Sequence, residues 1–90
     1  MTKIAIIATG ILLATASLAN AGSLGRPCTA TPQNQWLSLD ALQAKVEALG
    51  YKVQKAKLKA ACGELYTIDT NGSRVELFVD PTSGAIVGKL

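Results

Sequence analysis

The first twenty-one residues constrain this chain most, because they have the pattern of an export signal and leave only sixty-nine residues to fold. Lys3 supplies a positive start, residues 4–18 form an uncharged apolar run, and residues 19–21 read Ala-Asn-Ala, the small-x-small pattern of a cleavage site. We therefore expect residues 1–21 to be a signal peptide that is cut before Gly22. An uncleaved anchor is the alternative, but the apolar run is shorter than the roughly 20 residues that span a bilayer. The mature protein should be periplasmic or secreted, with no stable membrane anchor.

The charged residues of the mature chain argue against several classes of function. Eight basic residues stand against six acidic ones, a balance too mild to indicate a nucleic-acid partner. Histidine is absent, which excludes histidine-assisted nucleophilic catalysis and histidine-ligated metal sites. The carboxylates of the second half are spread over strands and turns and do not converge as an acid/base pair would; they are Glu64, Asp69, Glu76 and Asp80. We predict that the protein is not an enzyme and has no catalytic residue, cofactor or metal site.

The two cysteines, Cys28 and Cys62, are expected to form a structural disulfide. Exported thiols tend to be oxidised, and two cysteines allow only one intramolecular pairing. A domain this small has a marginal core, and closing a loop of 34 positions would add roughly 3 to 4 kcal/mol of stability. The alternative is a pair of reactive or metal-binding thiols, which would be expected to have a CxxC spacing or further ligands.

One helix is predicted after an extended N-terminal arm at residues 22–35, which holds two prolines and shows no periodicity. Ser38 stands where an N-cap belongs, and Asp40 falls in the first turn, where the helix dipole favours a negative charge. Gly50 supplies a left-handed stop after about eleven helical residues. Apolar residues recur at helical spacing and should face the core; they are Leu39, Leu42, Val46 and Leu49. Trp36, just before the helix, is either a lid on the core or a ligand platform.

The chain beyond the helix has the two-residue period of strands, and its clearest element is a hairpin around Asn71 and Gly72. This dipeptide suits both central positions of a type I′ turn. Taking it as the turn pairs Ile68 with Val75, and the remaining pairs follow as Thr70 with Ser73, Tyr66 with Leu77, and Glu64 with Val79. The face toward the helix would then hold Tyr66, Ile68, Val75, Leu77 and Val79. The opposite face would hold Leu65 and Phe78, which could form a partner-binding patch, be ordinary surface residues, or be covered by the N-terminal arm.

Two further strands should flank this hairpin. Residues 51–59 alternate with a slip at Gln54 and Lys55, which indicates a β-bulge. Residues 80–84 read as a proline-containing turn, and residues 85–87 can return as a short last strand. The predicted fold class is α+β, with one α-helix packed on a three- to four-stranded antiparallel sheet.

The lysines of the first strand allow two interpretations. Lys55, Lys57 and Lys59 fall on one face, and Lys52 adds to the positive charge. They could contact an acidic partner or an anionic envelope surface. They could also deter unwanted pairing at the edge of the sheet, as edge lysines commonly do.

The order and spacing of these elements resemble the PepSY domain family. The resemblance covers about residues 34–87 and is carried by Trp36-Leu37-Ser38 opening the helix, Gly50-Tyr51-Lys52-Val53 leaving it, Glu64-Leu65-Tyr66-Thr67-Ile68-Asp69, Asn71-Gly72, Val75-Glu76-Leu77, and Asp80-Pro81-Thr82-Ser83-Gly84. It implies an α+β fold and a binding or regulatory role, since related domains occur in the propeptides of secreted metallopeptidases, where inhibition has been proposed. The family has no shared catalytic motif to carry over.

Together these observations predict an exported, non-catalytic module, with a PepSY-like domain at residues 36–90. Its expected function is to bind another exported protein or a peptide and to modulate a peptidase or an envelope enzyme. The alternative is a binder of an anionic small ligand or envelope surface that uses the basic edge strand.

Overall fold

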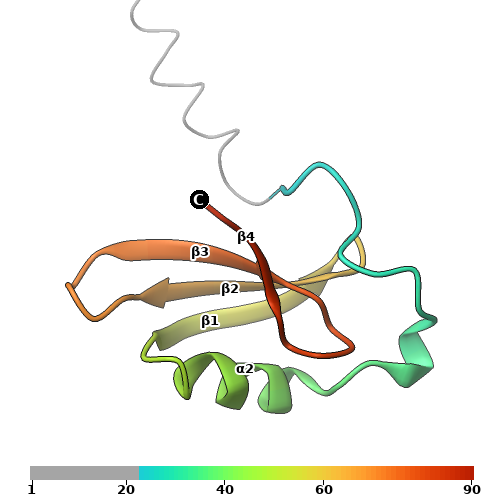
Figure 1. Ribbon diagram of the computed structural model, residues 1–90, viewed down its shortest axis with the longest axis horizontal. Coiled ribbons are helices and arrows are strands. Elements are labelled where there is room, and N and C mark those ends of the chain that lie inside the picture. The colour runs from blue at the N-terminus through green and yellow to red at the C-terminus, as the bar shows by residue number, and fades with distance from the viewer. Residues whose placement is uncertain (1–22) are drawn as a thin grey trace, which may run out of the picture.

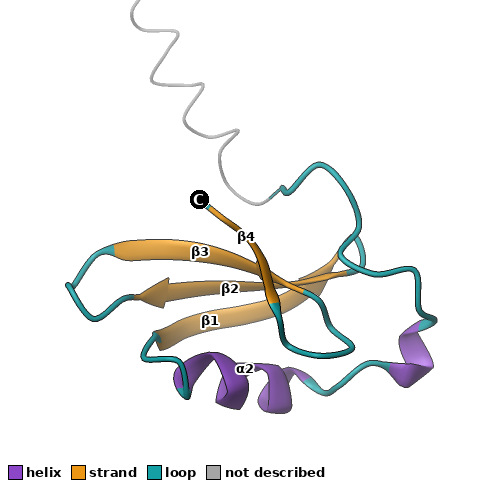
Figure 2. Cartoon of the chain, viewed as in Figure 1, coloured by secondary structure: helices purple, strands orange, loops and turns teal. Residues whose placement is uncertain are grey.

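A computed structural model describes residues 23–90, so the predicted signal peptide lies outside the described residues. The elements in chain order are η2 (Gln33–Gln35), α2 (Leu39–Glu47), β1 (Lys52–Lys59), β2 (Cys62–Ile68), β3 (Arg74–Val79) and β4 (Ile86–Lys89). The four strands form one antiparallel sheet in sequential order, and α2 packs beneath β1 and β2 (Figures 1 and 2). The predicted α+β fold is confirmed. Within residues 23–90 no helix is long and apolar enough to cross a membrane.

The helix begins as predicted and ends early. The Ser38 hydroxyl accepts a hydrogen bond from the Ala41 amide at 3.1 Å, and Leu42 and Val46 are fully buried. The helix proper ends at Glu47, and the Leu49 amide bonds back only three residues, to the Val46 carbonyl. Such a tightened last turn rotates its side chains off the α-helical stripe. Leu49 is therefore 63% exposed, and its predicted place in the core was wrong.

The β2–β3 hairpin has a register one residue away from the predicted one. Its turn runs from Asp69 to Ser73, with the Asp69 carboxylate accepting hydrogen bonds from the Asn71 and Ser73 amides, each at 2.9 Å. Gly72 alone takes a positive φ, of 85°, so the loop has three residues instead of two. Ile68 consequently pairs with Arg74, where the predicted partner was Val75.

This shift exchanges the two faces of β2, because successive side chains of a strand point to opposite sides. Leu65 is fully buried under the helix, opposite Leu77, and Tyr66 and Ile68 lie on the other side of the sheet. The predicted inward positions were right for β3 and wrong for β2. The core is made of Leu42, Val46, Leu65, Leu77 and Val79.

The predicted β-bulge in β1 is confirmed, because the register with β2 shifts between Val53 and Lys55. The extra residue keeps Val53, Ala56 and Leu58 all packed against the core. The bulge therefore places the apolar residues before and after the slip on the same side of the sheet.

The predicted disulfide between Cys28 and Cys62 is present, with an S–S distance of 2.06 Å. It ties the N-terminal arm to the start of β2, and the Cys28 amide also donates to the Ala61 carbonyl at 3.3 Å. The β1–β2 turn beside it consists of Ala60 and Ala61, which both have left-handed φ values, of 54° and 62°. Lys59 pairs directly with Cys62, so this is a two-residue turn of the type I′ kind, made without glycine or asparagine.

The remaining connections hold the arm and β4 in place. The Asp80 carboxylate accepts from the Thr82 amide at 2.8 Å, which forms the predicted turn before β4. Trp36 is half-buried, and its indole N–H donates to the Thr31 carbonyl at 2.8 Å, so its polar end fixes the arm. The Leu37 amide donates to the Pro81 carbonyl at 2.8 Å, which joins the segment just before α2 to the turn.

Candidate functional site

Within residues 23–90, α2 covers one face of the sheet and no helix covers the other, which we call the open face (Figure 1). Directly paired residues of an antiparallel sheet point to the same side, so the register assigns the side chains of this face. They are Lys52, Lys55, Lys57 and Lys59 from β1, Cys62, Glu64, Tyr66 and Ile68 from β2, and Arg74, Glu76 and Phe78 from β3. The open face thus gathers most of the charged residues of the strands.

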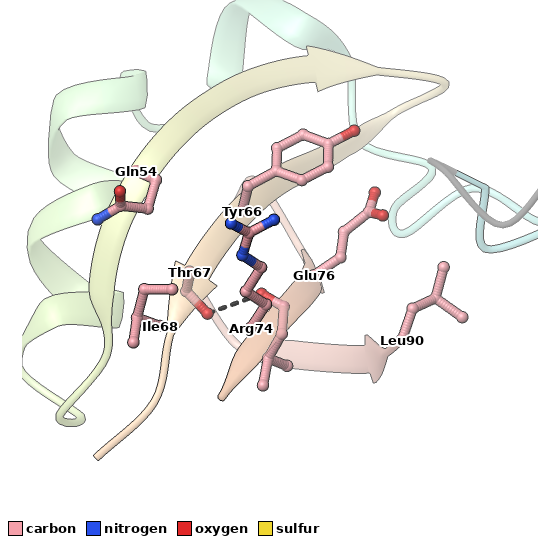
Figure 3. Close-up of a pocket in the computed structure, with 8 residues that line it drawn as sticks. Gln54, Tyr66, Thr67, Ile68, Arg74, Glu76 and Leu90 are labelled. Atoms are coloured by element: carbon pink, nitrogen blue, oxygen red, sulfur yellow. Dashed lines mark hydrogen bonds between the residues drawn. The ribbon is translucent and has the colours of Figure 1, made fainter. Parts of the chain in front are cut away.

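A groove of about 440 Å³ lies on the open face near the β2–β3 turn. Its lining includes Gln54, Tyr66, Ile68, Arg74, Glu76 and Leu90, which Figure 3 shows projecting from the strands and the C-terminal end of the chain. Leu90 is held there by two backbone hydrogen bonds with Glu76, of 2.9 and 3.1 Å. The groove offers an aromatic ring, a guanidinium group and apolar side chains, which suits the side chains of a bound peptide.

The β1 lysines form a row along the outer edge of the open face. The sequence placed three of them on one face, and the bulge adds the fourth, because Lys52 pairs with Ile68 and Lys55 pairs with Tyr66. Without the extra residue, two lysines three positions apart would point to opposite sides. Lys52, Lys55 and Lys59 are exposed, and the Lys57 side chain is 39% exposed.

Glu64 lies buried beside this row, with a side chain only 3% exposed. Its Oε1 atom is 3.9 Å from the Lys57 ammonium group and accepts no hydrogen bond from any group in residues 23–90. Burial raises the pKa of Glu64 above its usual value and the nearby Glu76 raises it further, while Lys57 and Lys59 lower it. Lys57 also lies 5.8 Å from the centre of the Tyr66 ring. Glu64 and Tyr66 therefore position Lys57 on the face.

The N-terminal arm covers the other end of the open face. Phe78 is only 1% exposed, and a Cβ atom placed on Gly88 would come within 2.5 Å of the Leu24 side chain and 3.7 Å of Phe78. Leu24 from the arm and Phe78 from β3 therefore both approach Gly88, and the end of the Leu24 side chain would have to shift to admit a larger residue there. A cavity of about 370 Å³ between the arm and the β1–β2 hairpin is lined in part by Arg26 and Glu64.

The predicted patch of Leu65 and Phe78 does not exist as an exposed surface. Leu65 belongs to the core under the helix because of the register shift, and Phe78 is covered by the arm. The three lysines are where the sequence placed them. Sequence reasoning selected none of the groove residues as a partner contact, and no motif marks Gln54, Arg74 or Leu90. The slip in alternation could have placed Lys52 on the face of the other lysines, because a bulge changes which side of the strand the earlier residues face.

Within residues 23–90 the open face supplies cations and a groove, and β1 beside it has an edge without a partner strand, a combination suited to binding. No group of three or more metal-ligating side chains occurs in the described part of the chain.

The family model of the peptidase propeptide and YPEB domain matches residues 3–89 of the 90-residue chain. The chain belongs to the PepSY family. Searches of curated proteins and of solved structures returned no match. PepSY domains are generally non-catalytic modules of the propeptide or inhibitor kind, so membership indicates a regulatory role.

Proposed function

We propose that this PepSY domain is an exported, non-catalytic module that binds an extended segment of another protein along the free edge of β1. The observation that carries the proposal is the edge itself. Among residues 23–90, β1 is an eight-residue strand with a neighbour on one side only, and the open face beside it holds the groove. A strand added there would gain backbone hydrogen bonds from the edge and side-chain contacts from the face.

The hydrogen-bonding pattern of the hairpin identifies the free groups. The pair that flanks a two-residue turn exchanges hydrogen bonds, and such pairs alternate with pairs that do not. Since Lys59 and Cys62 flank the turn, the amides and carbonyls of Leu58 and Ala56 point outward from the sheet. These two residues offer a partner strand two donors and two acceptors. The opposite edge is less suitable, because β4 has only four residues.

A secreted peptidase is the first partner to test. Peptidase propeptides are part of the family description, and an extended segment is the form in which a peptidase surface loop or terminus can join a sheet edge. The expected outcome of binding is inhibition or control of the peptidase. The disulfide and the family's usual extracellular or periplasmic setting support an exported partner.

The test uses the mature domain, residues 22–90, as bait in an extract of exported proteins, with two variants of one residue. Ala56→Pro removes the outward amide, and Ala56→Val adds similar bulk but keeps that amide. A specific partner should be captured by the wild type and by the valine variant, and lost with the proline variant. Both variants are first compared with the wild type by circular dichroism. Equal capture by the two variants would show that the edge is not used.

A second candidate function is direct binding to an anionic envelope surface, and the lysine row favours it. Salt-sensitive sedimentation with vesicles that contain anionic lipid, and none with neutral vesicles, would support this alternative.

A further inference from the structure

We infer that the segment bound at β1 is acidic at alternate residues, so that its carboxylates face the lysine row. This inference deepens the proposed function and rests on it. It is carried by the charge and spacing of Lys52, Lys55, Lys57 and Lys59, which the bulge brings to one side of the edge strand.

The spacing of the row matches the side-chain period of a strand. The lysines pair with every second residue of β2 and are therefore evenly spaced along the sheet, at about 6.8 Å per step. An added strand also presents every second side chain to the open face. Directly opposite side chains of neighbouring strands lie about 4.5 to 5.5 Å apart at Cβ, which lets a carboxylate reach a lysine ammonium group. The regular stretch from Lys55 to Lys59 is the part that can align without interruption by the bulge.

The exposed charges of the open face are positive in the region that a partner would contact. Among residues 23–90, the strand carboxylates of this face are Glu64 and Glu76, and both are buried, whereas Arg74 and the lysines carry exposed positive charge. The acidic residues of the helix, Asp40 and Glu47, are exposed on the covered side of the sheet. A basic segment would meet like charges along the whole edge, whereas an acidic one would be attracted, so the row selects partners by sign.

The surface fits a strand better than a membrane. Membrane-binding faces combine cations with several exposed apolar side chains that enter the lipid. In the described part of the chain the exposed large apolar residues are Leu49 and Leu90, and only Leu90 lies on the open face. The lysines instead flank the outward backbone groups of Ala56 and Leu58. The same row would discourage two copies of β1 from pairing, which leaves the edge available to an acidic segment.

The test measures binding of labelled nine-residue peptides to the exported protein by fluorescence anisotropy at low salt. One peptide has glutamate at alternate positions with threonine between, a second has lysine in place of glutamate, and a third is the glutamate peptide with N-methylated backbone amides. We expect the glutamate peptide to bind about tenfold more tightly than the lysine peptide, and less tightly as salt is added. N-methylation should abolish its binding, because it removes the donors of the added strand.

Matched charge reversals locate the binding on the protein. The variant Lys55→Glu/Lys59→Glu should weaken binding of the glutamate peptide about tenfold. The control Lys45→Glu/Lys89→Glu makes the same change in net charge away from the open face, since Lys45 is in α2 and Lys89 is paired with the core residue Leu77. It should change the affinity by about twofold or less. Lys57 is left intact because it contacts Glu64, and thermal unfolding checks that both variants fold.

The outcomes separate the two proposals. Equal binding of the glutamate and lysine peptides, with loss on N-methylation, would overturn the acidic preference and leave strand addition standing. Binding of the glutamate peptide that survives N-methylation would overturn strand addition. Absence of peptide binding overturns the inference, and if anionic vesicles are then bound, the lysine row serves a lipid surface. Equal effects of the two charge reversals would show that net charge, and not the row, attracts the peptide.

Discussion

Replacing the two alanines of the β1–β2 turn with asparagine and glycine should stabilise the domain. Ala60 and Ala61 both adopt left-handed backbone conformations, which cost a residue with a Cβ atom roughly 1 to 2 kcal/mol each. Asparagine and glycine tolerate these conformations, and Asn-Gly is the preferred pair for such a turn. Ala60 is exposed and Ala61 is only half-buried, so little packing is lost.

The magnitude follows from the strain relieved, fully by glycine and only in part by asparagine, minus the flexibility that glycine adds to the unfolded chain, about 0.5 to 1 kcal/mol. The double change Ala60→Asn/Ala61→Gly should therefore raise the free energy of unfolding by about 1 to 2 kcal/mol. For a domain of this size the midpoint of thermal unfolding should rise by roughly 5 to 15 °C. Urea denaturation with the disulfide intact measures the effect, and an unchanged m-value would show that the unfolded state is unaltered.

Ala85 provides a control with the opposite expected sign. It is exposed and does not have a positive φ, so Ala85→Gly relieves no strain and should lower the stability by about 0.5 to 1 kcal/mol. If Ala61→Gly destabilises the domain as Ala85→Gly does, the turn is not strained and the reasoning fails.

Four further results are expected. Glu64→Gln should raise stability at neutral pH by roughly 1 to 3 kcal/mol, because it removes a buried charge whose Oε1 accepts no hydrogen bond in the described structure. Burial raises the folded-state pKa of Glu64, so the stability that protonation confers is fully present below the usual value of 4.5 and is lost as pH rises through the folded-state pKa. The difference in free energy of unfolding between the variant and the wild type should therefore disappear in acid. Urea titrations from acid to neutral pH would test this. Leu65→Ala should cost about 2 to 5 kcal/mol in the same assay, whereas a surface position would lose little. Replacing Cys28 and Cys62 together with serine should cost about 2 to 5 kcal/mol, and non-reducing peptide mapping of the wild type should recover the linked fragments. The intact mass of exported protein should correspond to a chain that begins at Gly22, and a mass that retains the preceding residues would contradict cleavage there.

The parts of the fold that sequence predicted were those set by local chemistry. The Ser38 cap and the slip at Gln54 and Lys55 each depend on a few neighbouring residues, and the structure contains both. The turn of the second hairpin was mispredicted because Asn71-Gly72 favours a two-residue loop by itself, while the Asp69 carboxylate captures the two amides that close a longer one. The backbone preference of Asn71-Gly72 for a two-residue loop competes there with the hydrogen bonds of the Asp69 side chain. The Asn-Gly motif reflects only the backbone preference.

The candidate site was predictable to the extent that it follows from β1. The phase of the lysines can be read from the alternation of their own strand, which is why Lys55, Lys57 and Lys59 were placed together. Leu65 and Phe78 depend instead on the pairing of two strands and on where the arm lies. The packing of the Leu24 side chain against Gly88 brings together residues more than sixty positions apart, and no local pattern in the sequence predicts it.

The Asp69 turn also limits how residue roles can be transferred between members of the family. Two chains can align without a gap through Asn71 and Gly72 and still bury opposite sets of β2 side chains, if only one of them has a hydrogen-bond acceptor at position 69. In a relative with an alanine there, we expect the shorter turn, with the counterpart of Tyr66 turned inward and that of Leu65 outward. An aligned position in β2 therefore identifies a place in the chain but not the face of the sheet to which its side chain points. The residue at position 69 has to be known before that face can be assigned.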